Sequence, residues 1–162
     1  MTTVTATLLI SACGKSSPKA SQSVTVNNDE SSVENRVTVS NQTIDIIPSE
    51  GTTQLAAINL GYILTQSAEI LPPTINGVHA QANAVALNNQ GLAVAYNVAG
   101  DVQAGAIDIV NIEGKTAKIK SDLEYATRDI NSIFWGKSAI YAVGTDSTTG
   151  QRFLSRIRVD GA

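Results

Sequence analysis

Short runs of apolar residues alternate with polar clusters along most of the chain, which is the pattern of β-strands joined by turns. Val37, Val39, Ile44 and Ile46 mark the first predicted strands, because they recur with a period of two. No stretch of twelve or more residues keeps a helical period with capping residues. The pattern therefore predicts an all-β fold. Further runs of strand length lie at 54–66, 83–87, 91–97, 105–112, 116–125, 131–135, 138–144 and 152–159.

Two segments of this pattern can be laid over each other, one starting at Asn83 and the other at Asn131. The offset is 48 at these two asparagines and becomes 47 after the first hairpin, so that Ala95 falls on Ala142. Residues 116–129 fill the gap between the copies as a fourth strand and a crossover. Four strands in roughly 50 residues are the unit of a β-propeller blade. At the offset of 47, residues 106–112 fall on 153–159.

The segment from Gly105 to Thr145, "GAIDIVNIEGKTAKIKSDLEYATRDINSIFWGKSAIYAVGT", resembles one turn of the LVIVD-type repeat. Asn111 lies near the position where that family tends to carry Asp. The resemblance implies a β-propeller in a secreted or envelope protein. Residues 51–162 supply about two and a half blades, whereas closed propellers have roughly four to eight. We therefore expect an incomplete propeller in the N-terminal part of a longer protein, with a small antiparallel β-sandwich as the alternative.

Composition narrows the class of protein further. The chain has 162 residues, of which 43 % are hydrophobic and 15 % are charged, so it is neither a disordered chain nor a coiled coil. A net charge of −3 with no basic patch, and an aromatic content of 4 %, give no reason to expect nucleic acid as a partner. No apolar run is long enough for a transmembrane helix.

The only cysteine, Cys13, follows the apolar run 4–12, which has the length of a signal-peptide core. Ile10, Ser11, Ala12 and Cys13 resemble the bacterial lipobox. The resemblance implies that the Cys13 thiol receives a diacylglyceryl group and that the signal is cut between Ala12 and Cys13. No Lys or Arg precedes the apolar run, although a signal peptide usually opens with positive charge. A lone buried cysteine that acts as a small hydrophobe is the alternative.

These observations predict three segments. Residues 1–12 are a lipoprotein signal peptide, 13–35 are a flexible Ser-rich tether, and 36–162 are a β-propeller-like domain. Ordered structure is expected to begin between about residue 36 and residue 55, where the strand pattern starts. The lipid anchor that the lipobox resemblance implies is expected to place the protein in the membrane of a bacterial cell envelope.

The sequence indicates no catalytic, cofactor or metal site. His79 is the only histidine, and with no cysteine to join it, it cannot build a zinc site of three or four ligands. Asp101 and Asp146 occupy the same loop of the two copies, but each loop offers one carboxylate, so we interpret both as turn residues. Arg128 and Asp129 are interpreted as an exposed pair.

Other polar and aromatic positions have structural interpretations. Asn83 and Asn131 are expected to form repeated turn hydrogen bonds. Tyr96, Trp135 and Tyr141 are expected in the core or between blades. The sequence thus favours a lipid-anchored envelope protein whose propeller is a binding or assembly scaffold for a protein or glycan. The alternative is a fragment of a secreted enzyme whose catalytic residues lie outside this chain.

Overall fold

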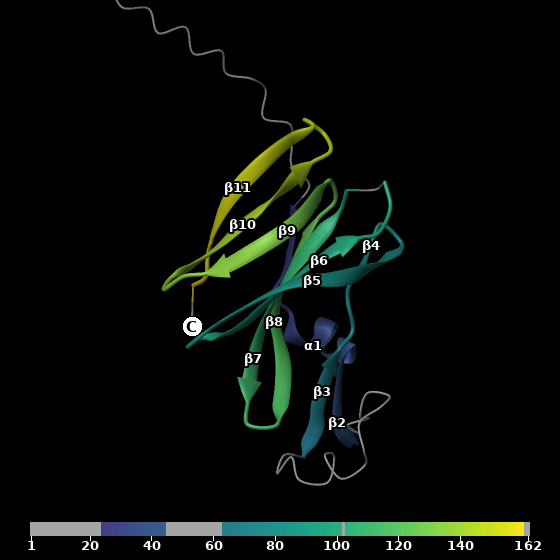
Figure 1. The fold of residues 1–162 in the computed structure, drawn as a ribbon, viewed down its shortest axis with the longest axis vertical. Helices are drawn as coiled ribbons and strands as arrows, with labels where there is room; N and C mark the ends of the chain where they lie inside the picture. Colours follow the sequence, from purple (N-terminus) through teal and green to yellow (C-terminus); the bar gives the residue numbers. More distant parts are fainter. Residues whose placement is uncertain (1–23, 45–62, 102, 161–162) are drawn as a thin grey trace, which may run out of the picture.

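The computed structural model describes residues 24–44, 63–101 and 103–160, and within these residues the chain is all-β, as the apolar pattern predicts. Figure 1 shows β9, β10 and β11 across one end of the molecule and the β2–β3 ribbon at the opposite end. The elements are β1 (Val24–Asn27), α1 (Glu30–Val33), the 3-10 turn η1 (Glu34–Arg36), β2 (Val37–Ile44), β3 (Leu64–Ile70), β4 (Thr74–Ile75), β5 (Val78–Asn88), β6 (Gly91–Val98), β7 (Gly105–Glu113), β8 (Thr116–Tyr125), β9 (Arg128–Trp135), β10 (Ala139–Asp146) and β11 (Gln151–Arg158).

The described strands form three antiparallel sheets. The large sheet has the order β1-β8-β7-β6-β5-β4 and is curled like half a barrel. The small sheet has the order β11-β10-β9, and β2 pairs with β3 in a two-stranded ribbon. β5, β6, β7 and β8 pair one after another in sequence order, and so do β9, β10 and β11, so both sheets are built on meanders.

Both faces of β6 are buried, which explains why its sequence is a nearly continuous apolar run. Val94 and Tyr96 lie on the first face of the large sheet, in a core cluster that Val33 of α1 joins. Ala93 and Ala95 alternate with them and lie on its second face, against the small sheet. Fully burying one aliphatic side chain contributes about 1.5–3 kcal/mol. The second cluster comprises Ala93, Ala95, Ile107, Tyr125, Ile130, Trp135, Ile140 and Ala142.

The two meanders share the position of a β-bulge. In the β5–β6 hairpin the pairing skips one residue, Asn83, between the pairs Ala82–Tyr96 and Ala84–Ala95. In the β9–β10 hairpin it skips one residue between Ile130–Gly144 and Ser132–Val143, and that residue is Asn131. The two asparagines therefore occupy the same register position, as the alignment at offset 48 placed them.

The strand register corrects the rest of that alignment. Leu87 pairs with Leu92 and Trp135 pairs with Ile140, so the offset of 48 continues through the first hairpin. It falls to 47 only at the third strand, where residues 106–112 correspond to 153–159 as predicted. The register partner of Ala95 is Val143, and the match of Ala95 to Ala142 was wrong. The two turns have the same length, because the Gly136 amide donates to the Ala139 carbonyl at the position where Asn88 pairs with Gly91.

The N-terminal border of the folded part also differs from the prediction. Residues 24–35 were assigned to the tether, but Val24–Asn27 form β1, which pairs with β8, and α1 follows. Asp29 caps α1, because its carboxylate accepts a hydrogen bond from the Ser31 amide at 3.1 Å. The sequence signal for β1 was the alternation of polar and apolar residues in "SVTVN", which has the period of a strand. The signal peptide, Cys13, the rest of the tether and the predicted strand residues 54–62 lie outside the described residues.

Candidate functional site

A groove of about 590 Å³ opens where the small sheet and the second face of the large sheet separate, and we call it the inter-sheet groove. Ile107, Ile109 and Leu123 of β7 and β8 line the large-sheet side. Trp135, Ile140 and Ile157 line the small-sheet side. Because the small sheet has three strands and the large sheet six, β7 and β8 are covered less completely than β5 and β6. The groove is thus apolar and walled by strands on both sides.

Polar side chains surround the mouth of the inter-sheet groove. Lys120 Nζ lies 2.9 Å from Glu30 Oε1, and Ser121 Oγ donates a hydrogen bond to Asn28 Oδ1 at 2.8 Å. The Glu30 hydrogen bond raises the pKa of Lys120. Lys120 is the extra residue of a bulge in β8, which re-aims its side chain relative to the strand. An apolar floor with a charged mouth suits an amphipathic ligand.

Trp135 contributes a buried donor to the groove wall. The residue is 4 % exposed, and its indole Nε1–H has no hydrogen-bond partner within the described residues. A buried N–H without an acceptor costs about 1–3 kcal/mol. The Trp135 side chain lines the inter-sheet groove, so a bound ligand would lie beside it. The prediction that Trp135 lies in the core is confirmed, and its unpaired N–H is a feature that the sequence did not signal.

The two edges of the small sheet differ. At the β9 edge, the Asn83 side chain donates to the Ile130 carbonyl and the Ile130 amide donates to Asn97 Oδ1, both at 2.5 Å. Side chains of the large sheet therefore satisfy the β9 backbone at its bulge. β11 pairs with β10 along one edge, and its other edge has no strand beside it in the described part of the chain. The expected turn role of Asn83 was wrong, because its amide bonds across the sheets.

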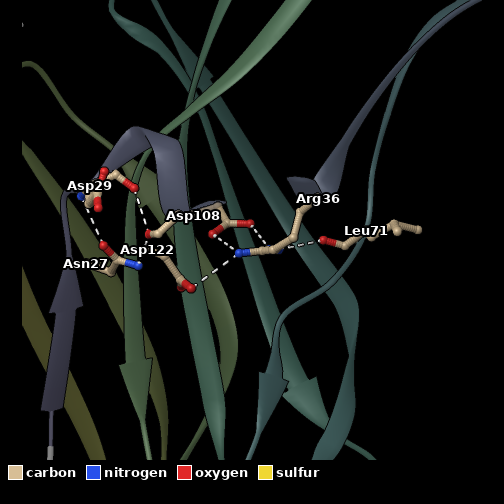
Figure 2. Close-up of polar contacts among 7 residues, drawn as sticks. Asn27, Asp29, Arg36, Leu71, Asp108 and Asp122 are labelled. Carbon is tan, nitrogen blue, oxygen red and sulfur yellow. Dashed lines mark hydrogen bonds and ion pairs between the residues drawn. The ribbon is translucent and has the colours of Figure 1, made fainter. Parts of the chain in front are cut away.

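A second polar site lies on the first face of the large sheet, and Figure 2 shows it. The Arg36 guanidinium donates to both carboxylate oxygens of Asp108 and to Asp122 Oδ2, the last at 3.2 Å. Arg36 Nε also donates to the Leu71 carbonyl at 2.9 Å. Asp108 is 0 % exposed and Asp122 is 5 % exposed. We call these three charged residues the Arg36 cluster; it ties η1 to β7 and β8.

The Arg36 cluster holds two carboxylates against one guanidinium. Asp108 and Asp122 are direct cross-strand partners, so their charges repel each other. Burial, followed by the nearby Asp108 charge, raises the pKa of Asp122 to about 7. Burial also raises the pKa of Asp108, against the opposing effect of Arg36. Burial and Asp108 together raise the pKa of Tyr96. This cluster was not predicted from the sequence, although Asp108 inside the apolar run of β7 was a possible signal.

Arg128 and Asp146 form another buried ion pair, with Nε and Oδ2 2.8 Å apart. The guanidinium of Arg128 also lies 4.4 Å from the centroid of the Phe153 ring. The predicted exposed pair of Arg128 with Asp129 was therefore wrong. Asp146 accepts a hydrogen bond from the Thr148 amide at 2.9 Å, which is the turn role that was predicted for it. The Arg128 hydrogen bond lowers the pKa of Asp146.

The remaining predicted positions are separate from these sites. His79 lies in β5, where its Nδ1 is 2.9 Å from Thr74 Oγ1, and Asp101 is exposed in the loop after β6. Tyr141 was expected in the core or between blades; it is 38 % exposed on the small sheet, so it does not lie in the core. The described residues contain no group of three or more His, Cys, Asp or Glu side chains that could hold a metal ion.

Comparisons of the chain with protein-family models, with curated proteins and with solved structures found no match. Within residues 24–44, 63–101 and 103–160, no helix has the length and apolar character needed to cross a membrane.

Proposed function

We propose that the chain is a lipid-anchored binding scaffold of a bacterial cell envelope that holds a protein partner in the inter-sheet groove. The anchor is Cys13, which the lipobox-like residues Ile10 to Ala12 precede. The observation that carries the binding role is the groove itself, which combines apolar walls, the unpaired edge of β11 and the unpaired Trp135 indole. A protein partner suits this surface better than a glycan, because backbone groups and apolar side chains match its lining.

The arrangement of the sheets supports the further proposal that the two meanders are successive blades of a β-propeller. Leu92 and Val94 of β6 correspond in register to Ile140 and Ala142 of β10. Leu92 and Val94 face the N-terminal segment. Their counterparts in the small sheet, Ile140 and Ala142, face the large sheet. The sheets thus pack head to tail, which is how repeated units stack upon one another.

Site-specific cross-linking in bacteria that express the full chain tests the binding role. A photoreactive residue replaces Val159, which lines the inter-sheet groove, and in a matched variant it replaces Lys115, which is exposed on the β7–β8 turn. We expect Val159 to give one discrete adduct that mass spectrometry identifies and that re-forms with the purified partner. Equal adducts at both positions, or none at Val159, would contradict a groove-bound partner.

Metabolic labelling with an alkyne fatty acid tests the anchor. The full chain is expected to incorporate the label and fractionate with membranes, and the Cys13→Ser variant is expected to lose both properties. A mature protein that still begins at Met1, or label that persists in the Cys13→Ser variant, would show that the lipobox interpretation is wrong.

A further inference from the structure

β11 has two chemically different sides. Phe153 and Ile157 are partly buried and pack against the core cluster between the sheets. Arg152, Leu154 and Arg156 alternate with them on the opposite side and are exposed, Leu154 to 70 %. Arg152 and Arg156 make no ion pair with any described residue. A strand beside β11 would therefore meet an apolar row on one side and a cationic row on the other.

The register shows what belongs beside β11. Val110 pairs with Leu92 and Ile157 pairs with Ile140, so β11 occupies the position in the small sheet that β7 has in the large sheet. β7 pairs with β6 along one edge and with β8 along the other. The corresponding second edge of β11 borders the inter-sheet groove, because Ile157 and Val159 line it.

We infer that an extended segment of a partner protein, with alternating apolar and acidic residues, adds to this edge of β11 as an antiparallel strand. This inference rests on the proposed function and names its partner chemistry. Main-chain hydrogen bonds to β11 would give affinity, and the alternating side chains would give specificity. The apolar side chains would enter the inter-sheet groove over Ile107 and Leu123, and the acidic ones would lie beside Arg152 and Arg156.

Arg152 and Arg156 also disfavour pairing of β11 with the β11 strand of a second copy of the chain. An exposed strand edge invites pairing with another chain, and charges on that edge oppose pairing with a copy of itself. Two antiparallel β11 strands would bring arginines together on one side. The side chains of an acidic segment would instead be attracted to Arg152 and Arg156, so the β11 edge discriminates between partner strands by their charge. The segment would be about as long as β11, which has 8 residues.

The test uses the full chain with Cys13→Ser and three synthetic octapeptides, each acetylated and amidated. The first alternates valine and glutamate, the second has the same composition in two blocks, and the third alternates valine and lysine. Trp135 is the only tryptophan, so its fluorescence and its indole proton resonance report on the groove. Hydrogen exchange of the β11 amides reports on pairing at the edge.

We expect the alternating valine–glutamate peptide to shift the Trp135 signals and protect β11 amides, and the block peptide to do neither. In an Arg152→Glu and Arg156→Glu double variant, the preference should reverse toward the valine–lysine peptide, with affinity for the glutamate peptide falling about tenfold. The Lys115→Glu variant, which changes an exposed charge away from the groove, should keep the original preference.

Strand addition would be overturned if the block peptide bound as tightly as the alternating valine–glutamate peptide, or if the protected amides lay outside β11. An unchanged peptide preference in the double variant would also overturn it. If Val159 cross-links to an identified partner while no peptide protects β11, strand addition is wrong and the groove-binding role stands. If Val159 gives no specific adduct, the proposed function fails regardless of what the peptides do.

Discussion

Arg36 joins the N-terminal segment to the large sheet through buried charges. Its guanidinium contacts Asp108 and Asp122, and its Cζ lies 5.9 Å from the centroid of the Tyr96 ring. The favourable Coulomb energy of such a buried pair is largely offset by desolvation. Removing one partner is nevertheless costly, because the remaining charges stay buried without compensation.

Replacement of Arg36 by methionine is therefore expected to lower the free energy of unfolding by about 3–5 kcal/mol. Urea unfolding followed by Trp135 fluorescence at pH 7.5 measures the change. The matched control is Arg158→Met, whose partner Asp160 is 70 % exposed in its side chain. That variant should stay within about 1 kcal/mol of the unmodified chain. Similar losses in the two variants would contradict the special role of Arg36.

The pH dependence of stability follows from Asp122. Its pKa is about 7 in the folded chain, whereas an unfolded aspartate has a pKa of about 3.9. Between these values the folded chain holds a proton that the unfolded chain has released. Stability from this group is thus fully present below about pH 4 and is lost as the pH rises through about 7. Asp108 contributes in the same direction, because its pKa is also raised.

We expect the free energy of unfolding to fall by an amount on the order of 1–3 kcal/mol between pH 4.5 and pH 7.5. The Asp122→Asn variant should remove most of this slope, since asparagine does not titrate. The Asp101→Asn variant, which changes an exposed carboxylate in a loop, should retain it. Urea unfolding at several pH values makes the comparison. A slope that survives in Asp122→Asn would show that another group titrates.

At the scale of elements, the bulge in β9 requires a glycine in β10. Gly144 pairs with Ile130 at the register shift. A Cβ at Gly144 would overlap the Asp129 carbonyl oxygen and would lie 2.9 Å from Phe153 Cζ. Backbone atoms cannot move aside as a flexible side chain can. The requirement for glycine comes from close approach of two strands, because the Gly144 backbone has an ordinary φ.

The Gly144→Ala variant is expected to lose about 2–4 kcal/mol of unfolding free energy, because the added methyl group forces β9 and β10 apart. Gly136→Ala is the matched control in the same hairpin, where the nearest atom to an added Cβ is 3.4 Å away. Thermal unfolding should show a clear fall in Tm for the first variant and little change for the second. Equal melting temperatures would show that the strands adapt to the methyl group.

At the scale of the whole molecule, head-to-tail packing of the sheets leaves one face of the small sheet exposed. We call it the outer face, and it carries Phe134, Tyr141, Val143 and Leu154, which are 66 %, 38 %, 40 % and 70 % exposed. In register they correspond to residues of the large sheet that pack against the small sheet. Exposed apolar patches of this kind promote association between molecules.

The full chain is therefore expected to self-associate through the outer face at high concentration. A Phe134→Ser and Leu154→Ser double variant should be monomeric with a similar Tm, because both side chains contact solvent. The control is Val39→Ser with Ile44→Ser, which removes two exposed apolar side chains from β2. Light scattering over a concentration series compares the association state of the unmodified chain with that of the two double variants. A monomeric unmodified chain, or equal association in both double variants, would contradict the prediction.

The sequence by itself determined the class of fold and most strand positions. Runs such as "GLAVAYN" and "GAIDIVNI" are local signals, since apolar periodicity and turn chemistry act within a few residues. The alignment at one offset placed Asn83 and Asn131 at equivalent positions, but only the strand register shows that both are bulge residues. The first strand was misassigned, because four residues of alternation carry too little information without their partner β8.

The candidate sites depended on tertiary structure. Arg36 lies 72 residues from Asp108 and 86 from Asp122, and no local pattern links them. Whether an aspartate in a strand is buried depends on which segment covers that face of the sheet. The inter-sheet groove likewise exists because β7 and β8 extend beyond the cover of a three-stranded sheet. Strand formation follows from short-range periodicity, whereas buried charges and open edges follow from long-range packing, which only the folded chain decides.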